Sequence, residues 1–444
     1  MRTSRTRPVV LFATLLVLAW PAGAGAQEQA PKPEPTGLEK LSPDWPSWLK
    51  VNVLYRGRVE ALRPVVGADA PYDGYYLNRL RLSVGVRPTS WLQVVGQIQD
   101  AEAMGHQASP PPRTMAGGFD LRQGYVEVGR KGPWGVLIAG GRQEFSLGDG
   151  RLIASPDWGN SSRTFDMGKV SAWIPGLRLD VFRAAAVDVD PARFDRVKPG
   201  EYVWGGYASM DRLPWLSAMD VYGFQKATSV ATGELGSRGD GRVSTFGTRL
   251  SARIGAGISA DFEGALQRGR LAADSVAAWA VHAGIAWTAA RQPLKPRLAV
   301  EYSHASGDRG ARDGRRTTFD QVYASNHAKY GLADLVGWRN MQAVTAKLDI
   351  APSKQLKVTG AVNRLWLATV ADAWYGSSGS KVVTNVKATS RDIGWEPDVL
   401  GTYAVSKEMT LGAGVAVLLP GGYARQSAAV DRYWSPYLMW SLKF

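Results

Sequence analysis

The sequence contains no cysteine and only four histidines, which removes several kinds of chemistry. Without cysteine there is no disulfide, no thiolate nucleophile and no thiolate metal ligand. The histidines are His106, His282, His304 and His327, and none of them lies at the spacing of a zinc motif such as His-Glu-x-x-His. No metal site, cofactor or catalytic residue is therefore predicted.

Long apolar runs are also missing beyond the N-terminus, because no later stretch stays apolar for the roughly 18 residues that mark a transmembrane helix candidate. The N-terminus itself has basic residues, the apolar run 9–20 and the small residues Ala24-Gly25-Ala26. This pattern predicts a secretory signal peptide over residues 1–26. An uncleaved anchor is the alternative, although a spanning helix needs roughly 20 apolar residues. The chain is thus expected to be exported.

Charge of one sign prevails in the chain, with 53 Lys and Arg against 39 Asp and Glu. Without the three arginines of the predicted signal peptide, 50 basic residues remain against 39 acidic ones, a net charge of +11. The basic residues are dispersed rather than clustered, and an exported chain rarely meets nucleic acid. Nucleic acid is therefore not a predicted partner.

Residues 27–47 are rich in proline and predict an extended periplasmic lead-in, whereas residues 48–444 alternate between apolar and polar side chains. Arg79 and Arg81, for example, interleave with Leu80 and Leu82. Eighteen strands are predicted: 48–60, 75–87, 90–102, 120–130, 134–145, 165–174, 177–187, 201–211, 216–226, 244–254, 258–268, 276–289, 295–306, 339–350, 354–369, 391–403, 409–418 and 433–444.

The connections between these strands alternate between short turns and long loops. The predicted long loops are 61–74, 103–119, 146–164, 188–200, 227–243, 307–338 and 370–390. Outer-membrane barrels have tight periplasmic turns and long external loops. The fold class is therefore all-β, a transmembrane up-and-down antiparallel β-barrel of 18 strands with long extracellular loops and short periplasmic turns. One such barrel over residues 48–444 also explains why the chain need not divide into several domains.

The two faces of the predicted strands differ in the way that a membrane barrel requires. One face of the last strand carries Trp434, Leu438 and Trp440, which is typical of a lipid-facing surface with an interfacial aromatic girdle. Other faces carry charges, and Arg or Lys against lipid at mid-bilayer costs about 2–4 kcal/mol. The charged faces are therefore expected to line a wet lumen, and eighteen strands leave room for an aqueous channel.

One stretch, 140–166, is denser in charge, glycine and aromatic residues than its surroundings. It reads Arg142-Gln-Glu144, Gly148-Asp149-Gly150-Arg151, Asp157-Trp158-Gly-Asn160 and Arg163-Thr-Phe165-Asp166. A second block contains Glu301-Tyr302-Ser-His304, Thr318-Phe319-Asp320, His327-Ala-Lys329-Tyr330-Gly331 and Gly337-Trp338-Arg339-Asn340. Together with Asn78-Arg79-Leu-Arg81 and Gln97-Ile-Gln99-Asp100, these motifs resemble the alginate export family of bacterial outer-membrane porins over roughly 75–444. The resemblance implies an eighteen-stranded barrel with an electropositive lumen that conducts an anionic polysaccharide.

Candidate pore-lining residues follow from this resemblance and from the strand faces. The matching motif arginines are Arg79, Arg81, Arg142 and Arg163, and the predicted inner faces add Arg249 and Arg297. Arginine offers a planar fork that fits the carboxylate of each uronate sugar. The alternative is that the arginines pair with acids and hold the loop in place, the loop-pinning candidates being Glu144, Asp149, Asp157 and Asp166. Asp308, Asp313 and Asp320 lie in the long loop 307–338 without the spacing of a calcium loop, so a solvated or lumen-folded loop is favoured.

The predicted function is an outer-membrane channel for an alginate-like anionic polysaccharide. The expected partners are outer-membrane lipid, the polysaccharide and periplasmic export machinery, with the chain as a monomer. Two alternatives stay open: an uptake or general diffusion porin for small anions or sugar acids, and an outer-membrane barrel enzyme that acts on lipid or an envelope polymer.

Overall fold

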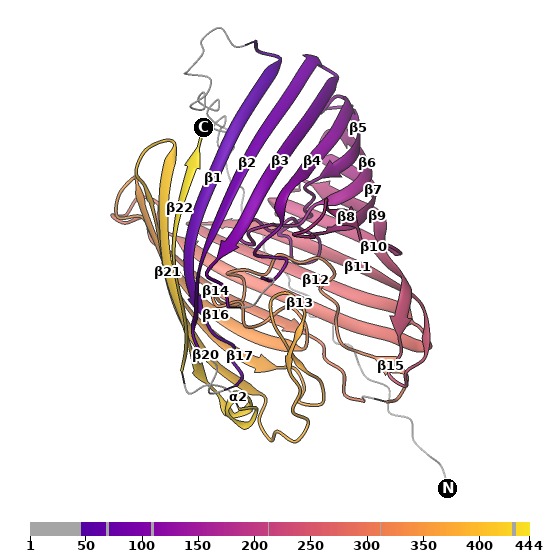
Figure 1. The fold of residues 1–444 in the computed structure, drawn as a ribbon, viewed down its shortest axis with the longest axis vertical. Coiled ribbons are helices and arrows are strands. Elements are labelled where there is room, and N and C mark those ends of the chain that lie inside the picture. The colour runs from indigo at the N-terminus through magenta and orange to yellow at the C-terminus, as the bar shows by residue number, and fades with distance from the viewer. Residues whose placement is uncertain (1–45, 68–70, 108–110, 212, 311, 429–431) are drawn as a thin grey trace. The chain divides into compact units, whose positions relative to one another are not determined.

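The computed structural model describes residues 46–67, 71–107, 111–211, 213–310, 312–428 and 432–444, which form a closed antiparallel β-barrel (Figure 1). The predicted signal peptide lies outside the described residues, as does the predicted lead-in up to residue 45. Within the described residues, no helix is long and apolar enough to cross a membrane.

Eighteen strands form the wall, as predicted. They are β1 (Leu49–Leu62), β2 (Asp73–Thr89), β3 (Leu92–Met104), β4 (Gly118–Gly129), β5 (Val136–Gln143), β6 (Phe165–Ile174), β7 (Leu177–Asp188), β9 (Glu201–Met210), β10 (Ala218–Thr232), β11 (Arg238–Gly255), β12 (Ile258–Leu271), β13 (Asp274–Thr288), β14 (Arg297–Ala305), β16 (Met341–Ile350), β17 (Leu356–Leu367), β20 (Asp392–Ala404), β21 (Met409–Pro420) and β22 (Tyr433–Lys443). Four short strands and one short helix lie in the loops: β8 (Arg196–Val197), β15 (Arg315–Arg316), β18 (Trp374–Tyr375), β19 (Lys381–Val383) and α2 (Gly422–Gln426).

The barrel closes because the last strand pairs with the first. β22 runs antiparallel to β1, with Trp440 opposite Gly57, and Figure 1 shows the yellow β22 beside the indigo β1. The Trp440 ring lies directly over Gly57, so that any side chain there would collide with it. The same ring stacks on Tyr76 of β2, with ring centroids 5.7 Å apart. Glycine at position 57 therefore lets a girdle aromatic cover the closing seam.

The two ends of the barrel differ in the length of their connections. One end has the short turns 90–91, 130–135, 175–176, 211–217, 256–257, 289–296, 351–355 and 405–408. The other end carries the longest connections, 144–164, 306–340 and 368–391. Short turns face the periplasm in outer-membrane barrels, so the second end is the extracellular one.

One predicted loop is shorter in the structure. Residues 227–243 were expected to form a long loop, but β10 continues to Thr232 and β11 begins at Arg238. The two strands stay paired through an irregularity between Thr228 and Ala231, beyond which Ala231 lies opposite Gly239. Such a bulge absorbs the extra residues without ending the hairpin. The strands β10 and β11 therefore project further at the extracellular end than the sequence indicated.

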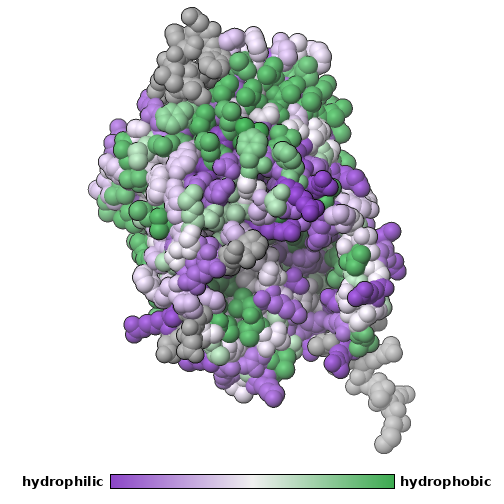
Figure 2. Space-filling view, viewed as in Figure 1, coloured by the Kyte–Doolittle hydropathy of each residue, from purple (hydrophilic) through white to green (hydrophobic). Residues whose placement is uncertain are grey.

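Alternation along each strand separates an apolar outer face from a polar inner face. Outward side chains are exposed, with Ile285 at 54%, Ile138 at 54% and Leu438 at 53%, whereas the inward Arg79 is fully buried at 0%. Figure 2 shows green hydrophobic side chains over the strands in the upper part of the view and a hollow below them that is framed by purple hydrophilic ones. The expected arrangement of lipid-facing apolar faces is present in the structure.

The lumen is partly filled by two of the extracellular connections, 144–164 and 306–340. Tyr323 of the second connection packs edge-on against Phe165, which points inward from β6, with ring centroids 5.4 Å apart. Ile153 of the first forms a parallel bridge with Tyr323, and the buried core continues through Phe319 and Trp338. The hydrophobic core of the barrel therefore consists of inward-folded loops packed against inward-facing residues of the wall, which removes their aromatic side chains from water.

Candidate functional site

The inner wall of β1 and β2 presents a concentration of arginines. Arg56 lies directly opposite Arg79 in the ladder, and the period of two places Arg58 and Arg81 on the same inner face. Arg122 joins them from β4, where the pairing with β3 skips one residue and the bulge turns its side chain inward. We refer to these five residues as the Arg cluster.

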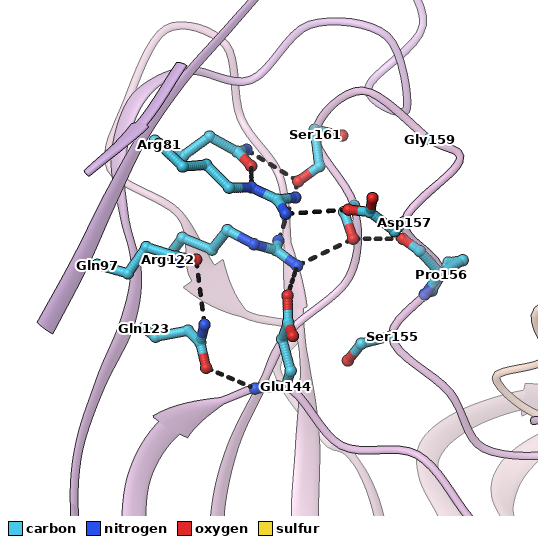
Figure 3. Close-up of polar contacts among 12 residues, drawn as sticks. Arg81, Gln97, Arg122, Gln123, Glu144, Ser155, Pro156, Asp157, Gly159 and Ser161 are labelled. Carbon is cyan, nitrogen blue, oxygen red and sulfur yellow. Dashed lines mark hydrogen bonds and ion pairs between the residues drawn. The ribbon is translucent and has the colours of Figure 1, made fainter. Parts of the chain in front are cut away.

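The Arg cluster surrounds Asp157, at the middle of the inward connection 144–164. The Arg79 Nη2 and Arg81 Nη1 atoms lie 3.0 Å and 2.9 Å from the Asp157 Oδ1 atom. Arg56 Nη1 donates to the backbone carbonyl of Asp157 at 2.6 Å. Figure 3 shows Arg81 and Arg122 reaching from the wall toward Asp157 and Glu144. Charged forks of this kind make the strong class of hydrogen bonds.

Neighbouring contacts hold the rest of this segment against the same wall. The Arg58 guanidinium lies 3.8 Å from the centroid of the Trp158 ring, and its Nη1 atom donates to the Trp158 carbonyl at 2.8 Å. Arg122 Nη2 donates to Glu144 Oε1 at 2.6 Å and to Ser162 Oγ at 2.9 Å. Enclosure in the lumen opposes ionisation of Asp157, but the charges of Arg79 and Arg81 outweigh it and lower the pKa of this carboxyl. Asp157 is therefore ionised at neutral pH.

The same connection reaches the opposite wall of the barrel. Asp149 Oδ1 accepts from Arg249 Nη2 of β11 at 2.7 Å, and Arg151 Nε lies 3.5 Å from Glu263 Oε2 of β12. Strands β2 and β11 are the second and tenth in a ring of eighteen, so they stand nearly across from each other. The segment between Asp149 and Asp157 therefore crosses the lumen and narrows it.

The second inward connection, 306–340, braces the first one. Arg163 Nη1 donates to the carbonyls of Tyr323 and Ala154, at 2.7 Å and 3.1 Å. The Trp158 ring stacks on the His327 ring with centroids 3.8 Å apart and planes at 7°. The contacts of Arg163 with Tyr323 and of Trp158 with His327 join residues that are more than a hundred positions apart, and they set the shape of the constriction.

A further tether links this connection to the wall strand β20. The Glu396 Oε1 and Asp398 Oδ2 atoms accept from the backbone N–H groups of Ala333 and Leu332, at 2.9 Å and 3.1 Å. Both carboxyl groups are buried. The acids at these inner positions thus hold the connection and are not open to the channel.

Arginines outnumber carboxylates within the Arg cluster. In the described part of the chain, the five guanidinium groups of the Arg cluster form ion pairs with three carboxylates, those of Glu60, Glu144 and Asp157. The Asp157 side chain is 67% exposed although its arginine partners are buried. Two positive charges of the Arg cluster therefore have no carboxylate among the described residues to balance them, and the carboxylate of Asp157 is open to the lumen.

Comparison with known families identifies the chain. The model of the alginate export family matches residues 47–434, nearly the whole described barrel. The chain belongs to the alginate export family. The resemblance inferred from the motifs is thus confirmed, and with the barrel fold it makes the protein an outer-membrane channel.

Solved structures agree with the fold. OccK1 (OpdK) of Pseudomonas aeruginosa matches with a TM-score of 0.56 and 13% sequence identity, over 89% of this chain and 98% of that one. OccD3 (OpdP) of the same organism matches with a TM-score of 0.60 and 11% identity, over 90% and 91%. A BenF-like porin of Pseudomonas fluorescens matches with a TM-score of 0.59 and 11% identity, over 90% of this chain and 99% of that one. No curated protein sequence matches the chain.

Four of the six predicted pore arginines lie on the inner wall. Arg79 and Arg81 belong to the Arg cluster, and Arg249 binds both Asp149 and Asp220. Arg297 lies nearer the periplasmic end, where its Nη1 atom is 3.1 Å from Asp349 Oδ2 of the neighbouring strand. Arg163 lies in the inward connection, as described above, and its contacts are to backbone carbonyls.

The expected placement of Arg142 is corrected by the strand register. Arg142 shares its face of β5 with Val136 and Ile138, which are exposed on the outside of the barrel. Its cross-strand neighbour is Asp166, and the Arg142 Nε and Asp166 Oδ1 atoms are 2.7 Å apart. Arg142 and Asp166 thus form an ion pair on the outer face near the extracellular rim, away from the lumen.

The four predicted loop-pinning acids each lie beside a guanidinium. Glu144 contacts Arg122 and Asp149 contacts Arg249, while Asp157 lies between Arg79 and Arg81. Asp166 pairs with Arg142, as above. Three of the four acids therefore hold the lumen-crossing connection, and one belongs to the outer rim.

Several residues of the site were not predicted from the sequence. The sequence does indicate an inward position for Arg56 and Arg58, because they alternate with apolar residues on β1 as Arg79 and Arg81 do on β2. No sequence pattern indicates the inward position of Arg122, because that position depends on a bulge in β4. Trp158 was within a recognised motif, but its stacking on His327 depends on the meeting of two connections.

One hydrogen-bonded row on the inner wall has the composition of a hydrolase triad. His282 of β13 lies 2.9 Å from Ser303 Oγ of β14 and 2.8 Å from Asp261 Oδ2 of β12. Ser303 is only 3% exposed, and it is the Asp261 carboxylate that reaches the lumen. The strands carrying the row are paired on both sides, so their backbone N–H groups are engaged in the ladders. The row therefore lacks an accessible nucleophile.

Proposed function

We propose that this channel conducts an anionic polysaccharide of the alginate-like class through its arginine-lined constriction. The proposal rests on one observation: the five arginines of the Arg cluster outnumber their three carboxylate partners and surround the exposed side chain of Asp157. Membership of the alginate export family supports it.

The chemistry of a polyuronate fits this arrangement. Each sugar carries one carboxylate, and Arg79 and Arg81 already hold a carboxylate, that of Asp157, at 3.0 Å and 2.9 Å. A uronate that replaced Asp157 would meet the same donors. Because the exchange swaps one carboxylate for another, its net free energy is small. Several weak contacts of this kind let a polymer enter without being trapped.

Planar-bilayer recordings test this proposal. Purified protein is expected to prefer chloride over potassium, and an oligomer of uronic acid is expected to block the current from either side. A neutral glucan of the same length serves as the control and should not block. Preference for cations, or equal block by the neutral glucan, contradicts the proposal.

The alternative is a channel for small organic anions or sugar acids. The lumen-crossing segment favours this alternative because it narrows the passage. In addition, one of the similar solved structures, OpdK of Pseudomonas aeruginosa, contains vanillate, which is a small carboxylate. The same recordings separate the two. Block by monomeric uronate at concentrations at which the oligomer has no effect would favour the small-anion channel.

The monomeric state and the periplasmic export machinery stay predictions. Light scattering of the detergent-solubilised protein tests the first, since a monomer of this chain has a protein mass of 48.0 kDa before any cleavage. Cross-linking in intact cells tests the second.

A further inference from the structure

A groove lies on the outside of the barrel at its extracellular end, separate from the constriction in the lumen. It has a volume of about 570 Å³ and lies over the outward faces of β12, β13 and β14, bounded by residues 306–310 and by Asp313, Arg315 and Thr317. Its floor includes Leu266 and Trp279, which are 54% and 46% exposed. The short strand β15, labelled at the lower right of Figure 1, borders the groove and pairs with the first residues of β13, Ser275 and Val276.

Three arginines line the groove, and none of them forms an ion pair with a described acidic residue. Arg268, Arg309 and Arg315 line it and are exposed. Within the described residues, no carboxylate forms an ion pair with any of the three. The one side-chain hydrogen bond of Arg268 in that part of the chain is to the carbonyl of the adjacent Gln267, at 2.7 Å. Three guanidinium groups without a direct ion pair to the described residues therefore line one groove.

Two acids, Asp308 and Asp313, also line the groove, so that its three arginines exceed its carboxylates by one. Asp308 Oδ1 accepts from the backbone N–H of Gly310 at 3.1 Å, and Asp313 Oδ1 accepts from that of Arg315 at 2.8 Å. His304 adds a further polar group, because its ring stacks on Trp279 and its buried Nδ1 atom has no hydrogen-bond partner among the described residues. The two carboxylates therefore accept from backbone N–H groups, and the side chains of the three arginines stay available to a ligand.

The position of the groove decides what kind of anion it meets. Arg268 shares its outward face of β12 with Phe262 and Leu266, so the groove opens directly onto the lipid-facing surface. An arginine facing lipid at mid-bilayer costs about 2–4 kcal/mol but little at the interface. Trp279 lies near the extracellular start of β13, and tryptophan is enriched at membrane interfaces. A ligand here would have a charged head at the extracellular interface and apolar chains along the strands.

We propose that this groove binds the phosphate groups of a phosphorylated, multiply acylated glycolipid of the outer leaflet, with its acyl chains lying on Leu266 and Trp279. Phosphate matches guanidinium forks in the same bidentate manner as carboxylate does. The site is separate from the constriction, so it does not depend on the proposed transport function.

Binding of lipid A to the full-length protein in detergent tests the proposal. The probes are bisphosphorylated lipid A, the same lipid with its phosphates removed, and inorganic phosphate, with bound lipid measured by native mass spectrometry. Because several charge-assisted contacts are lost, removal of the phosphates is expected to weaken binding about tenfold or more. Equal binding of the two lipids overturns the proposal, and so does inorganic phosphate that binds as tightly as lipid A.

Variants locate the site. The triple substitution R268Q/R309Q/R315Q is expected to weaken lipid A binding by the same factor, about tenfold or more. The matched control is R183Q/R193Q/R196Q, which removes three other exposed arginines of the extracellular half. An equal loss in both variants would indicate a general charge effect and refute the groove. If the triple variant does not show the heat-modifiable migration of a folded barrel, R268Q alone is used, with about a threefold loss expected and no loss refuting the site.

Discussion

The substitution D157N isolates the charge at the constriction. Asparagine has nearly the same shape as aspartate, and the backbone carbonyl of residue 157 keeps its hydrogen bond from Arg56 at 2.6 Å. Arg58 continues to hold the next residue through its contact with the Trp158 carbonyl at 2.8 Å. The lumen-crossing segment therefore stays in place, and the Arg cluster loses one of its three carboxylates.

The size of the effect follows from Coulomb's law. One unit charge at about 6 Å from a permeating ion changes its energy by about 0.7 kcal/mol in a water-like medium. Since about 1.4 kcal/mol is a factor of ten, anion occupancy rises about threefold and cation occupancy falls about threefold. The ratio of chloride to potassium permeability is expected to rise about tenfold, and a less polar lumen would enlarge this change.

The measurement is the reversal potential of single channels in a planar bilayer under a potassium chloride gradient. D166N is the matched control, because Asp166 undergoes the same chemical change on the outer face, where it pairs with Arg142. The control is expected to leave the reversal potential unchanged. A ratio that stays constant in D157N, or an equal shift in D166N, would refute the assignment of Asp157 to the conducting lumen.

Four further predictions concern other parts of the barrel. Because Arg142 lies on the outer face, Arg142→Glu should leave ion selectivity unchanged and lower only the temperature of the heat-modifiable gel shift; altered selectivity would contradict its placement. Burial and the charge of Arg151 lower the pKa of Lys329 to about 8, so anion preference should fall as pH rises from 7 to 9, and Lys329→Met should abolish this fall. Gly57→Leu should hinder closure of the barrel, since overpacking costs about 1–3 kcal/mol, and urea unfolding followed by tryptophan fluorescence measures it. Trp158→Ala removes a ring that stacks across the constriction, so single-channel conductance should increase; an unchanged conductance would show that Trp158 does not limit the passage.

The strands could be predicted because their signal is local. Side chains on a strand alternate every two residues, so a membrane on one side and water on the other leave a pattern within each short segment. β6, for example, has the bounds Phe165–Ile174 in the structure, the same as those predicted. The same local rule places Arg79, Arg81, Arg249 and Arg297 on the inner face. Arg142 was misplaced because a motif match was followed there, although Val136 and Ile138 mark its face as the outer one.

The sequence by itself therefore determined the barrel, its number of strands, its family and most of its inner face. Only the tertiary structure decided that the connection 144–164 crosses the lumen. It also showed that Arg79 and Arg81 contact Asp157 instead of facing an open channel. The physical reason is that a loop has no period. Its course depends on contacts between distant residues, such as Arg163 with Tyr323 and Trp158 with His327, and these exist only once the wall has closed and brought both connections into one lumen.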